Sequence, residues 1–426
     1  MFTATAAFAQ HGNILNGAGP INLSMGGAAT GNPSDIMGAI YWNPAGLSTF
    51  DQTEVVLTGT AIFSTSELAS TVPNPASPGT FISGNTASNS GTTVVPSLAI
   101  LYKPNNEKWR FAFSALGVSG FLTEYPEDNT NPILFAPPAG VGPTITEEYA
   151  LLQLGFTAVY SVSDRVAVGI TPNINLATIG GTPFLAVPPD RDVNGSGFFP
   201  GVQDGNAIGF GAQVGVFYNA PSGFSLGLSY KSPQIFNDFE LETIPSLQGA
   251  AIRNETLNVD HPAIYSIGSG FTNAKWKFAL DLRYIDFENT DGLGTTGYAA
   301  DGRQLGFGWG NVFALATGVQ YSINDRLPIR FGYSYGNSPI EEEDVIFTVP
   351  APSTIEHAIN FGLGYSFSNH LQANIAYHRG FSNRIEGPLT LASGVVPGGS
   401  VGTELATDFL SIGLNYKFIK KGNTQK

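Results

Sequence analysis

The 426-residue chain has no cysteine, little charge and no long apolar run. The missing cysteine excludes disulfides, Fe–S clusters and thiolate zinc sites, and it suits an oxidising periplasm or cell surface. Charged residues make up 12% of the chain, about half the share in soluble domains. No run of 18 or more apolar residues occurs, so no segment is suited to cross a membrane as a helix. The net charge of −14 argues against nucleic acid as a partner, because a phosphate backbone attracts basic patches.

What the chain has in abundance is aromatic side chains and glycine. Phe, Trp and Tyr make up 12% of the residues, and there are 52 glycines. The mean hydropathy of +0.05 is too low for a bundle of membrane helices. A membrane β-barrel reconciles these values, because every second residue of each strand faces lipid while the others face water.

Alternating hydrophobicity runs from about residue 53 to Phe418. The pattern is clearest at 410–418, where apolar residues alternate with Ser, Gly, Asn and Lys. The same period of two occurs at 224–231, 276–284 and 359–367. Because successive side chains of a strand point to opposite faces, these stretches are predicted to be β-strands.

The strand ends and faces distinguish a membrane barrel from a soluble sandwich, which has the same period. Aromatic girdles at two membrane interfaces would explain the aromatic residues near the strand ends, namely Trp109, Tyr160, Tyr230, Trp276, Tyr284, Tyr321 and Tyr377. Charges repeated on the opposite faces would destabilise a sandwich core but suit a wet lumen. These lumen charges include Arg110, Lys231, Asp281, Arg283 and Arg330.

Short and long connections alternate along the chain. Short turns with Asn, Asp, Pro or Gly are expected near 104–107, 161–164, 220–222, 272–274, 323–327 and 368–370. Long loops are expected at 64–92, 119–146, 178–203, 232–253, 289–305, 337–353 and 381–403. This pattern predicts an all-β fold, a transmembrane antiparallel β-barrel of about fourteen strands with periplasmic termini and external long loops.

The first fifty residues differ in composition and pattern from the rest of the chain. Ala7-Phe8-Ala9 has the small-residue pattern of a signal cleavage site, so residues 1–9 are expected to be a residual signal peptide. A basic region before it is missing, and an ordinary N-terminus is the alternative. Residues 10–50 are rich in Gly, Asn and Pro and show no period of two.

Three stretches carry the residues of a known family. The first has Gly17-Ala18-Gly19, Ser24-Met25-Gly26-Gly27-Ala28, Asp35 and Tyr41-Trp42-Asn43-Pro44-Ala45-Gly46-Leu47. The second is 226–233 with Asp238-Phe239, and the third is 330–335 with 338–340 and His357. Together these stretches resemble the long-chain fatty acid outer-membrane transporter family of the FadL/TodX type, and the resemblance covers essentially the whole chain.

The resemblance implies a monomeric barrel whose lumen is closed by an N-terminal hatch. Residues 10–50 would form the hatch, residues 51–418 the barrel and residues 419–426 a C-terminal periplasmic tail. The hatch and gating residues carried over are Met25, Gly26, Gly27, Asn43, Pro44, Ala45 and Gly46. The alternative is that Asn-Pro-Ala-Gly only turns the chain into the first strand. The chain departs from the family pattern because eight residues follow the terminal aromatic residue Phe418.

The resemblance also implies a lateral exit beside a kinked third strand. That strand is expected from Lys108 to about Val118, with Gly117 and Gly120 as candidate kink residues, since glycine permits a bulge. A plain strand end before a loop is the alternative.

Two expected long loops are rich in apolar residues. The first contains Phe121, Leu122, Leu134 and Phe135, and the second contains Phe184, Leu185, Phe198 and Phe199. Exposed apolar groups in outer loops predict a capture groove for hydrophobic molecules. The alternative is a self-packed loop core that keeps the mouth closed. The lumen cations are expected either to meet a substrate carboxylate or to pair with lumen acids such as Asp281.

The sequence therefore predicts a non-enzymatic transport protein of the Gram-negative outer membrane, with lipid and lipopolysaccharide around it and no cofactor. Its predicted substrates are hydrophobic small molecules, either long-chain fatty acids or aromatic hydrocarbons. A structural or adhesive barrel is one rival, and an outer-membrane lipase with a Ser–His pair is another. Asp190–Gly195 matches half of a calcium loop, but position twelve is Gly201 instead of the required Glu, so no metal is expected.

Overall fold

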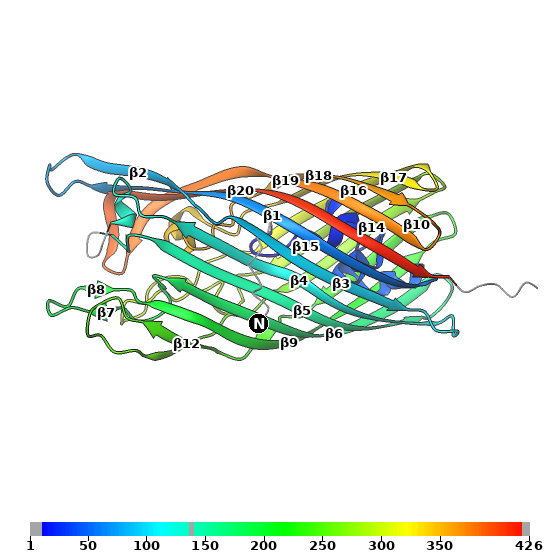
Figure 1. Ribbon diagram of the computed structural model, residues 1–426, viewed down its shortest axis with the longest axis horizontal. Helices are drawn as coiled ribbons and strands as arrows, with labels where there is room; N and C mark the ends of the chain where they lie inside the picture. The colour runs from blue at the N-terminus through cyan, green and yellow to red at the C-terminus, as the bar shows by residue number, and fades with distance from the viewer. Residues whose placement is uncertain (1–10, 136–139, 420–426) are drawn as a thin grey trace, which may run out of the picture.

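The computed structural model describes residues 11–135 and 140–419 and shows an all-β barrel. The expected signal peptide and nearly all of the C-terminal tail lie outside these residues. The antiparallel sheet closes on itself, because β1 (Thr53–Pro73) pairs with β20 (Gly394–Phe418) from Thr53–Phe418 to Thr71–Ser400. Figure 1 shows the tilted strands wrapped around the N-terminal segment. The prediction of a fourteen-stranded antiparallel barrel is confirmed.

Several wall strands are interrupted, so the fourteen passages contain more than fourteen segments. Between β1 and β20 the wall consists of β2 (Phe81–Ala87) with β3 (Thr92–Tyr102), β4 (Trp109–Tyr125), β5 (Ile145–Ser161), β6 (Val166–Thr182), β9 (Gly201–Asn219), β10 (Phe224–Lys231) with β11 (Ile235–Phe236) and β12 (Phe239–Ile244), β13 (Asn254–Leu257) with β14 (Ala263–Thr272), β15 (Trp276–Asp286), β16 (Val312–Asn324), β17 (Leu327–Gly336), β18 (His357–Ser366) and β19 (Leu371–Leu391). The break after β10 contains Pro233, which has no N–H to donate to a ladder.

The short turns lie where the sequence places them, but two of the expected long loops are wrong. Most of 64–92 is the ladder of β1 and β2, and nearly all of 381–403 is the hairpin of β19 and β20. Both arms lie at the loop end of the barrel, and the β1–β2 arm projects far out from it (Figure 1). Small polar residues hide the alternation in the β1–β2 arm, and Gly387-Pro388 resembles a turn in the other arm.

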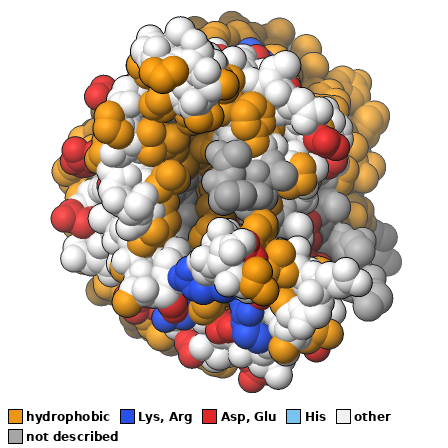
Figure 2. Space-filling model, turned by 90° about the vertical axis from the view of Figure 1, so that its left-hand side faces the viewer, with side chains coloured by type: hydrophobic (Ala, Val, Ile, Leu, Met, Phe, Trp, Pro, Cys, Tyr) orange, Lys and Arg blue, Asp and Glu red, His pale blue; other side chains and the backbone are white. Residues whose placement is uncertain are grey.

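The remaining loops carry small elements of their own. They are the 3₁₀ turns η2 (Pro132–Leu134) and η3 (Glu342–Thr348) and the paired β7 (Asp190–Arg191) and β8 (Gly197–Phe198). Figure 2 looks onto this end and shows hydrophobic side chains spread round the rim. Phe81, Ile252 and Val395 are among the exposed apolar residues there.

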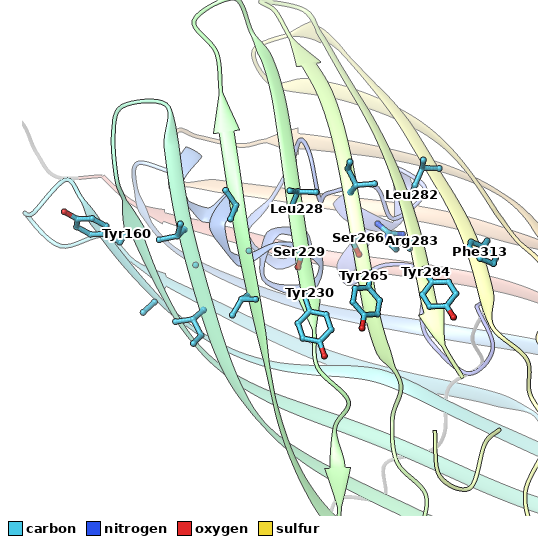
Figure 3. A pocket seen from close by; sticks show the side chains of 18 of the residues that line it. Tyr160, Leu228, Ser229, Tyr230, Tyr265, Ser266, Leu282, Arg283, Tyr284 and Phe313 are labelled. Carbon is cyan, nitrogen blue, oxygen red and sulfur yellow. The ribbon is translucent and has the colours of Figure 1, made fainter. Parts of the chain in front are cut away.

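The outer wall is apolar and carries aromatic pairs at both ends. Trp276 lies 4.6 Å from Tyr321 between ring centroids at the end with the short turns. At the loop end, Tyr230 lies 4.9 Å from Tyr265, and Tyr284 continues the row on the next strand (Figure 3). A shallow concavity of about 880 Å³ on this outer face lies between the two levels. The arrangement matches the aromatic girdles that the sequence predicts for two membrane interfaces.

The N-terminal residues 11–50 lie inside the barrel, and we call this segment the hatch. The hatch contains α1 (Gly19–Ser24), α2 (Ile36–Trp42) and the 3₁₀ helix η1 (Pro44–Thr49), so its lack of a period of two reflects short helical turns. Proline at the first helical positions suits α1 and η1, because a first-turn N–H has no helical partner. Among the described residues, no helix is long and apolar enough to cross a membrane.

Candidate functional site

The hatch contacts the barrel wall through a belt of inward-facing glycines. A Cβ added at any of them would stand 1.8–3.0 Å from a hatch atom, which leaves no room for a side chain. This glycine belt consists of Gly169, Gly215, Gly227, Gly268, Gly270, Gly318, Gly332, Gly362 and Gly413, on strands from β6 to β20. This role was not predicted from the sequence, although Gly227, Gly362 and Gly413 stand at regular inward positions. Their contact with a distant segment left no pattern in the sequence.

Asp281 and Arg283 on β15 hold the hatch by its backbone. Asp281 Oδ2 accepts hydrogen bonds from the N–H groups of Ala29 (2.7 Å) and Thr30 (2.8 Å), and Oδ1 accepts from Gly31 (3.2 Å). Arg283 Nη2 donates to Asp281 Oδ2 (2.7 Å) and to the Gly27 carbonyl (2.8 Å). Both side chains are fully buried. We call this pair the hatch anchor, since breaking a buried ion pair costs about 3–5 kcal/mol.

The hatch residues carried over from the family lie at these contacts. Met25 is fully buried, and its carbonyl lies against Gly318. Gly26 and Gly27 have φ of 67° and 82°, and a Cβ on Gly27 would stand 1.9 Å from the Asn16 carbonyl oxygen. The Met-Gly-Gly element therefore needs both glycines for its backbone conformation and for close packing.

Asn43 both turns the chain and ties it to the wall. Its side-chain oxygen accepts from Ala45 N (3.1 Å), and its amide donates to the Thr30 carbonyl (2.9 Å) and the Val216 carbonyl on β9 (3.1 Å). Pro44 and Ala45 lie against Gly169, while Gly46 packs on Pro33. The simple turn alternative therefore describes only part of what this residue does.

The wall is unpaired along part of its third strand. The ladder between β3 and β4 runs from Tyr102–Phe111 only to Leu98–Ala115. The two strands meet again higher up, where Asn89 N donates to the Glu124 carbonyl (2.7 Å). The intervening residues 90–97 and 116–123 form what we call the wall gap. Contrary to the plain strand-end alternative, β4 continues to Tyr125, and its register with β5 shifts between Gly117 and Ser119.

The first described residues of the hatch lie along this gap. Leu15 N donates to the Val118 carbonyl (3.1 Å), and Gly120 N donates to the Asn13 carbonyl (3.1 Å). The Ser119 hydroxyl also donates to the Asn13 carbonyl (2.7 Å). The irregular β4 segment thus satisfies its backbone with the hatch in place of β3.

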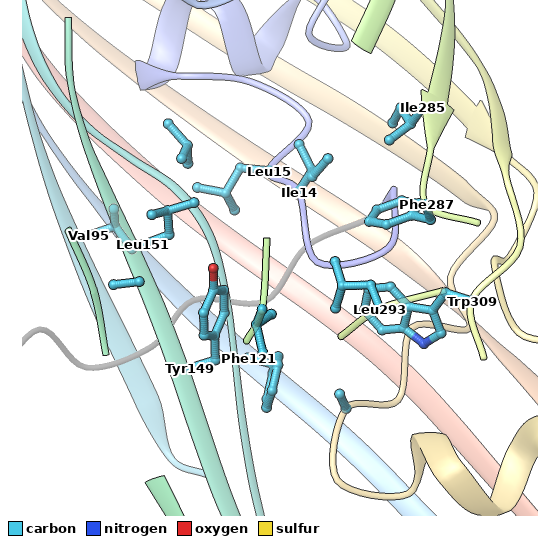
Figure 4. Packing of buried hydrophobic residues seen from close by; sticks show 14 of the residues in the cluster. Ile14, Leu15, Val95, Phe121, Tyr149, Leu151, Ile285, Phe287, Leu293 and Trp309 are labelled. Carbon is cyan, nitrogen blue, oxygen red and sulfur yellow. The ribbon is translucent and has the colours of Figure 1, made fainter. Parts of the chain in front are cut away.

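A continuous apolar cluster lies beside the gap and beneath the outer loops. Figure 4 shows Ile14, Leu15, Val95, Leu151 and Tyr149 facing one another, with aromatic rings beyond them. Of the residues predicted for capture, Phe121, Leu134 and Phe184 belong to this cluster and Leu122 packs against it. The others are half-buried, namely Phe135, Leu185, Phe198 and Phe199.

The structure corrects where some of these capture residues lie. Phe121 and Leu122 belong to β4 and not to a loop, because the strand continues past its kink. Phe121 stacks with Tyr149 at 5.6 Å between ring centroids. The cavity between the loops beside Phe184 and Phe307 holds about 20 Å³, about the space of a single water. In this conformation the loops are packed on themselves, as the alternative describes.

The other lumen cations are inside the barrel but not gathered at one point. Arg110 donates to the Phe50 carbonyl and pairs with Asp51 (both 3.0 Å). Arg330 donates to Gln320 Oε1 (2.7 Å) and Asn374 Oδ1 (3.2 Å). Lys231 lies over the ring of Tyr41, 4.8 Å from its centroid. The alternative prediction, that the lumen cations pair with acids, is therefore correct for Arg110 and Arg283.

The residues considered for calcium binding and for lipid hydrolysis make other contacts. Asp190 accepts from Ser246 and pairs with Arg253, so its carboxylate is already used within the loops. No cluster of His, Cys, Asp and Glu suited to a metal occurs among the described residues. His357 contacts Tyr333 on the outer wall, and His378 contacts Asn360, so neither of these bonds resembles a Ser–His pair.

Solved structures similar to this chain share its fold. A FadL homologue from Pseudomonas aeruginosa superposes with a TM-score of 0.73 at 15% identity, covering 96% of this chain and 100% of that chain. The P. putida toluene transporter TodX gives 0.68 at 17% identity, with 96% and 100% covered. At these identities the likeness shows the fold alone.

Relatives found by sequence match a smaller share of the chain than these solved structures do. The long-chain fatty acid transport protein of Escherichia coli O157:H7 is 23% identical over 209 residues, 45% of this chain and 46% of the relative. The 47 kDa outer membrane protein of Pasteurella multocida is 25% identical over 233 residues, 50% of this chain and 51% of the relative. The chain thus matches about half the length of these curated relatives.

A family model, in contrast, matches residues 2–387, which is most of the chain. With the closed barrel already described, this match also places the protein in the outer membrane. The chain belongs to the outer membrane protein transport protein family (OMPP1/FadL/TodX).

Proposed function

We propose that this protein takes up hydrophobic small molecules passively across the outer membrane, and that they leave the lumen sideways into the bilayer. The candidate substrates are long-chain fatty acids and aromatic hydrocarbons, after the names of the relatives. The observation that carries the proposal is the wall gap, where β3 and β4 are unpaired and the apolar cluster lies directly behind.

The gap offers a route because β3 and β4 are not joined by ladder hydrogen bonds there. Backbone groups in lipid must be satisfied internally, so an unpaired stretch of wall needs a second segment to cover it. Residues 13–15 of the hatch supply those hydrogen bonds to β4. Moving these few residues inward exposes a passage from the apolar cluster to the lipid, whereas every other strand pair would have to lose its ladder.

The hatch is the gate in this proposal, and the outer loops capture the substrate. A molecule that enters between the loops around Phe121, Leu134 and Phe184 meets apolar side chains down to Leu15. The loops must first open, since their packed cavity is too small for a substrate. Hatch and loops therefore change conformation together, and no energy source beyond the substrate gradient is required.

A disulfide across the gap tests the lateral route. A Cβ on Gly117 would lie 3.8 Å from Val95 Cβ, the mean separation in disulfides. The chain has no cysteine, so the double variant Val95→Cys/Gly117→Cys contains one possible bond. We expect the oxidised variant to lose uptake of a radiolabelled fatty acid or aromatic hydrocarbon in cells, and a reductant to restore it.

A second pair provides the control. Ile329 and Leu363 are directly opposite on the lipid-facing side of the β17–β18 ladder, away from the gap. The variant Ile329→Cys/Leu363→Cys should transport equally in both redox states. Unchanged uptake in the oxidised gap variant would show that substrate leaves elsewhere, and loss in both variants would point to general damage.

A further inference from the structure

Glu147, near the outer end of β5, carries a carboxyl group that is enclosed by the outer loops. Its side chain points inward, and the residue is 4% exposed. It lines the small cavity between the loops beside Phe184 and Phe307, and a Cβ on Gly181 of β6 would stand 3.1 Å from its Cγ. None of the ion pairs formed by the described residues involves this carboxyl group, although a buried charge is normally paired.

This part of β5 lies outside the membrane. The outward positions of the strand are apolar within 152–156 but polar at Thr146 and Glu148. Because the outer wall of a barrel is apolar where it meets lipid, the strand leaves the bilayer between these two sets. Tyr149, the next residue along the inward face, belongs to the apolar cluster (Figure 4). Glu147 therefore lies above that cluster, on the side of the external medium.

The side chains that line the cavity offer little to an ionised Glu147. They are apolar and come from β6, the loop after it and the segments 257–259 and 305–307, apart from Gln304. The Gln304 amide donates to the carbonyls of Gly306 (2.8 Å) and Phe347 (2.7 Å), so its protons are engaged elsewhere. A carboxylate in this position would have few donors and little water around it.

The charged groups on the surrounding segments do not compensate for this. Arg253 and Arg303 in the adjoining loops pair with acids of their own, Asp190 and Asp301. Further ionisable side chains on the segments packed around Glu147 include Glu148, Asp204, Asp260, His261, Asp291 and Asp344. Ionisation of Glu147 would thus add negative charge to a region that is already acidic.

Enclosure by the loops therefore favours the protonated form of Glu147. Loss of water around the carboxyl group raises its pKa from 4.5 to about 8. When the loops separate and water enters, this pKa returns towards its ordinary value. The closed loops thus hold a proton at neutral pH that the opened loops release to water.

We propose that Glu147 is a proton-dependent switch of the outer loops, whose neutral carboxyl group keeps them packed and whose ionisation opens them. The inference rests on the proposed function and names its trigger, because capture requires opening of loops that now enclose about 20 Å³. The proton stabilises the closed loops fully below about pH 4.5, and this contribution is lost as pH rises through about 8. Uptake should accordingly be slower in an acidic medium than in a neutral one.

Hydrogen exchange measures loop opening independently of transport. We would compare the full chain in lipid nanodiscs at about pH 5 and about pH 7.5, both between 4.5 and 8, after correction for intrinsic exchange rates. The probes are the Phe184 amide, which donates to the Pro200 carbonyl (2.8 Å), and the Gln304 amide, which donates to the Leu185 carbonyl (2.8 Å). Protection of both amides should fall at least about tenfold at the higher pH, since within this range each pH unit changes the opening equilibrium by up to about tenfold.

Three variants identify the group responsible. Glu147→Gln keeps the shape of the side chain and carries no charge at any pH, so its protection should stay high at both pH values. Glu147→Asp retains an ionisable group and should retain the pH dependence. Glu240→Gln removes an exposed carboxylate of β12 at the same end of the barrel and should behave as the parent protein does.

The outcomes separate this inference from the proposed function. Protection that is independent of pH in the parent protein, or that falls equally in Glu147→Gln, overturns the switch, and uptake of radiolabelled toluene or hexadecanoate by cells would then still support the proposed function. A fall confined to proteins with an acid at position 147, with residues 20–42 protected throughout, supports the switch. If cells in that case import neither probe at either pH, the switch stands and the proposed function fails.

Discussion

The barrel wall contacts the hatch in two different ways on its two sides. From β6 round to β20 the glycine belt brings the hatch into direct contact with the wall backbone, and the hatch anchor adds a buried ion pair. At the wall gap, the contact consists of a few hydrogen bonds from residues 13–15 to β4 and of apolar side chains. The first contact is extensive and contains a buried ion pair, whereas the second is local. Under the proposed lateral route, the barrel would open on this second side without releasing its hatch.

The largest expected effect comes from breaking the extensive contact at the hatch anchor. Asp281→Ala leaves Arg283 buried without its partner and removes the acceptor of three hatch N–H groups. We expect hatch docking to weaken by about 3–5 kcal/mol, measured as entry of hydrophilic antibiotics into cells and as raised single-channel conductance. The double variant Asp281→Ala/Arg283→Met should leak less, since no charge remains unpaired. Absence of leakage in the single variant would contradict the role of the anchor.

A smaller effect is expected from adding a side chain to the glycine belt. Gly332→Val forces a Cβ to within 2.0 Å of the Gly26 nitrogen, and overpacking of this kind costs about 1–3 kcal/mol. The same leak assays should detect partial displacement of the hatch. Gly59→Val is the matched control, because nothing lies within 4 Å of its added Cβ. Equal behaviour of the two variants would mean that the close fit has no role in closure.

The contact between the hatch and β4 at the wall gap can be weakened by removing one hydroxyl group. Tyr41→Phe removes the hydrogen bond to the Leu15 carbonyl, worth about 0.5–1.5 kcal/mol. We expect a modest rise in the rate at which a thiol reagent labels Val95→Cys at the wall gap, with no leak of hydrophilic antibiotics. A rise in antibiotic entry equal to that of Asp281→Ala would erase the distinction between the two sides.

The smallest effect on the hatch is expected from acid, which acts on the outer loops. Burial alone would raise the pKa of Asp190, but hydrogen bonds from Ser246 and Arg253 and the charge of Arg253 outweigh it and hold this pKa below 3.8. The carboxylate therefore stabilises the loop above pH 3.8, and this contribution is lost as pH falls through the lowered pKa. Hydrogen exchange should show loss of protection near 188–198 at low pH, absent in Asp190→Asn, while residues 20–42 stay protected. Loss of hatch protection in the same pH range would place the acid-sensitive contact elsewhere.

The strands of the wall could be predicted from the sequence because their alternation of apolar and polar residues is a local pattern. At 276–284 each residue faces lipid or lumen according to its position, so period, girdles and short turns predicted strand number and faces. The arm at 64–73 was missed because small polar residues stand on both of its faces, and the arm at 381–391 because Gly387-Pro388 resembles a turn. The capture residues Phe121 and Leu122 were assigned to a loop for a related reason, since glycines at 117 and 120 looked like a strand end.

The amino-acid sequence by itself determined the barrel, its place in the outer membrane and the family, since lipid imposes a two-residue period on every strand that crosses it. The tertiary structure decided what the inward positions do. Asp281 became an anchor and Lys231 an unpaired cation only because the hatch brings Ala29 to one and the ring of Tyr41 to the other. These partners are separated by some two hundred residues along the chain, and their meeting depends on closure of the barrel around the hatch.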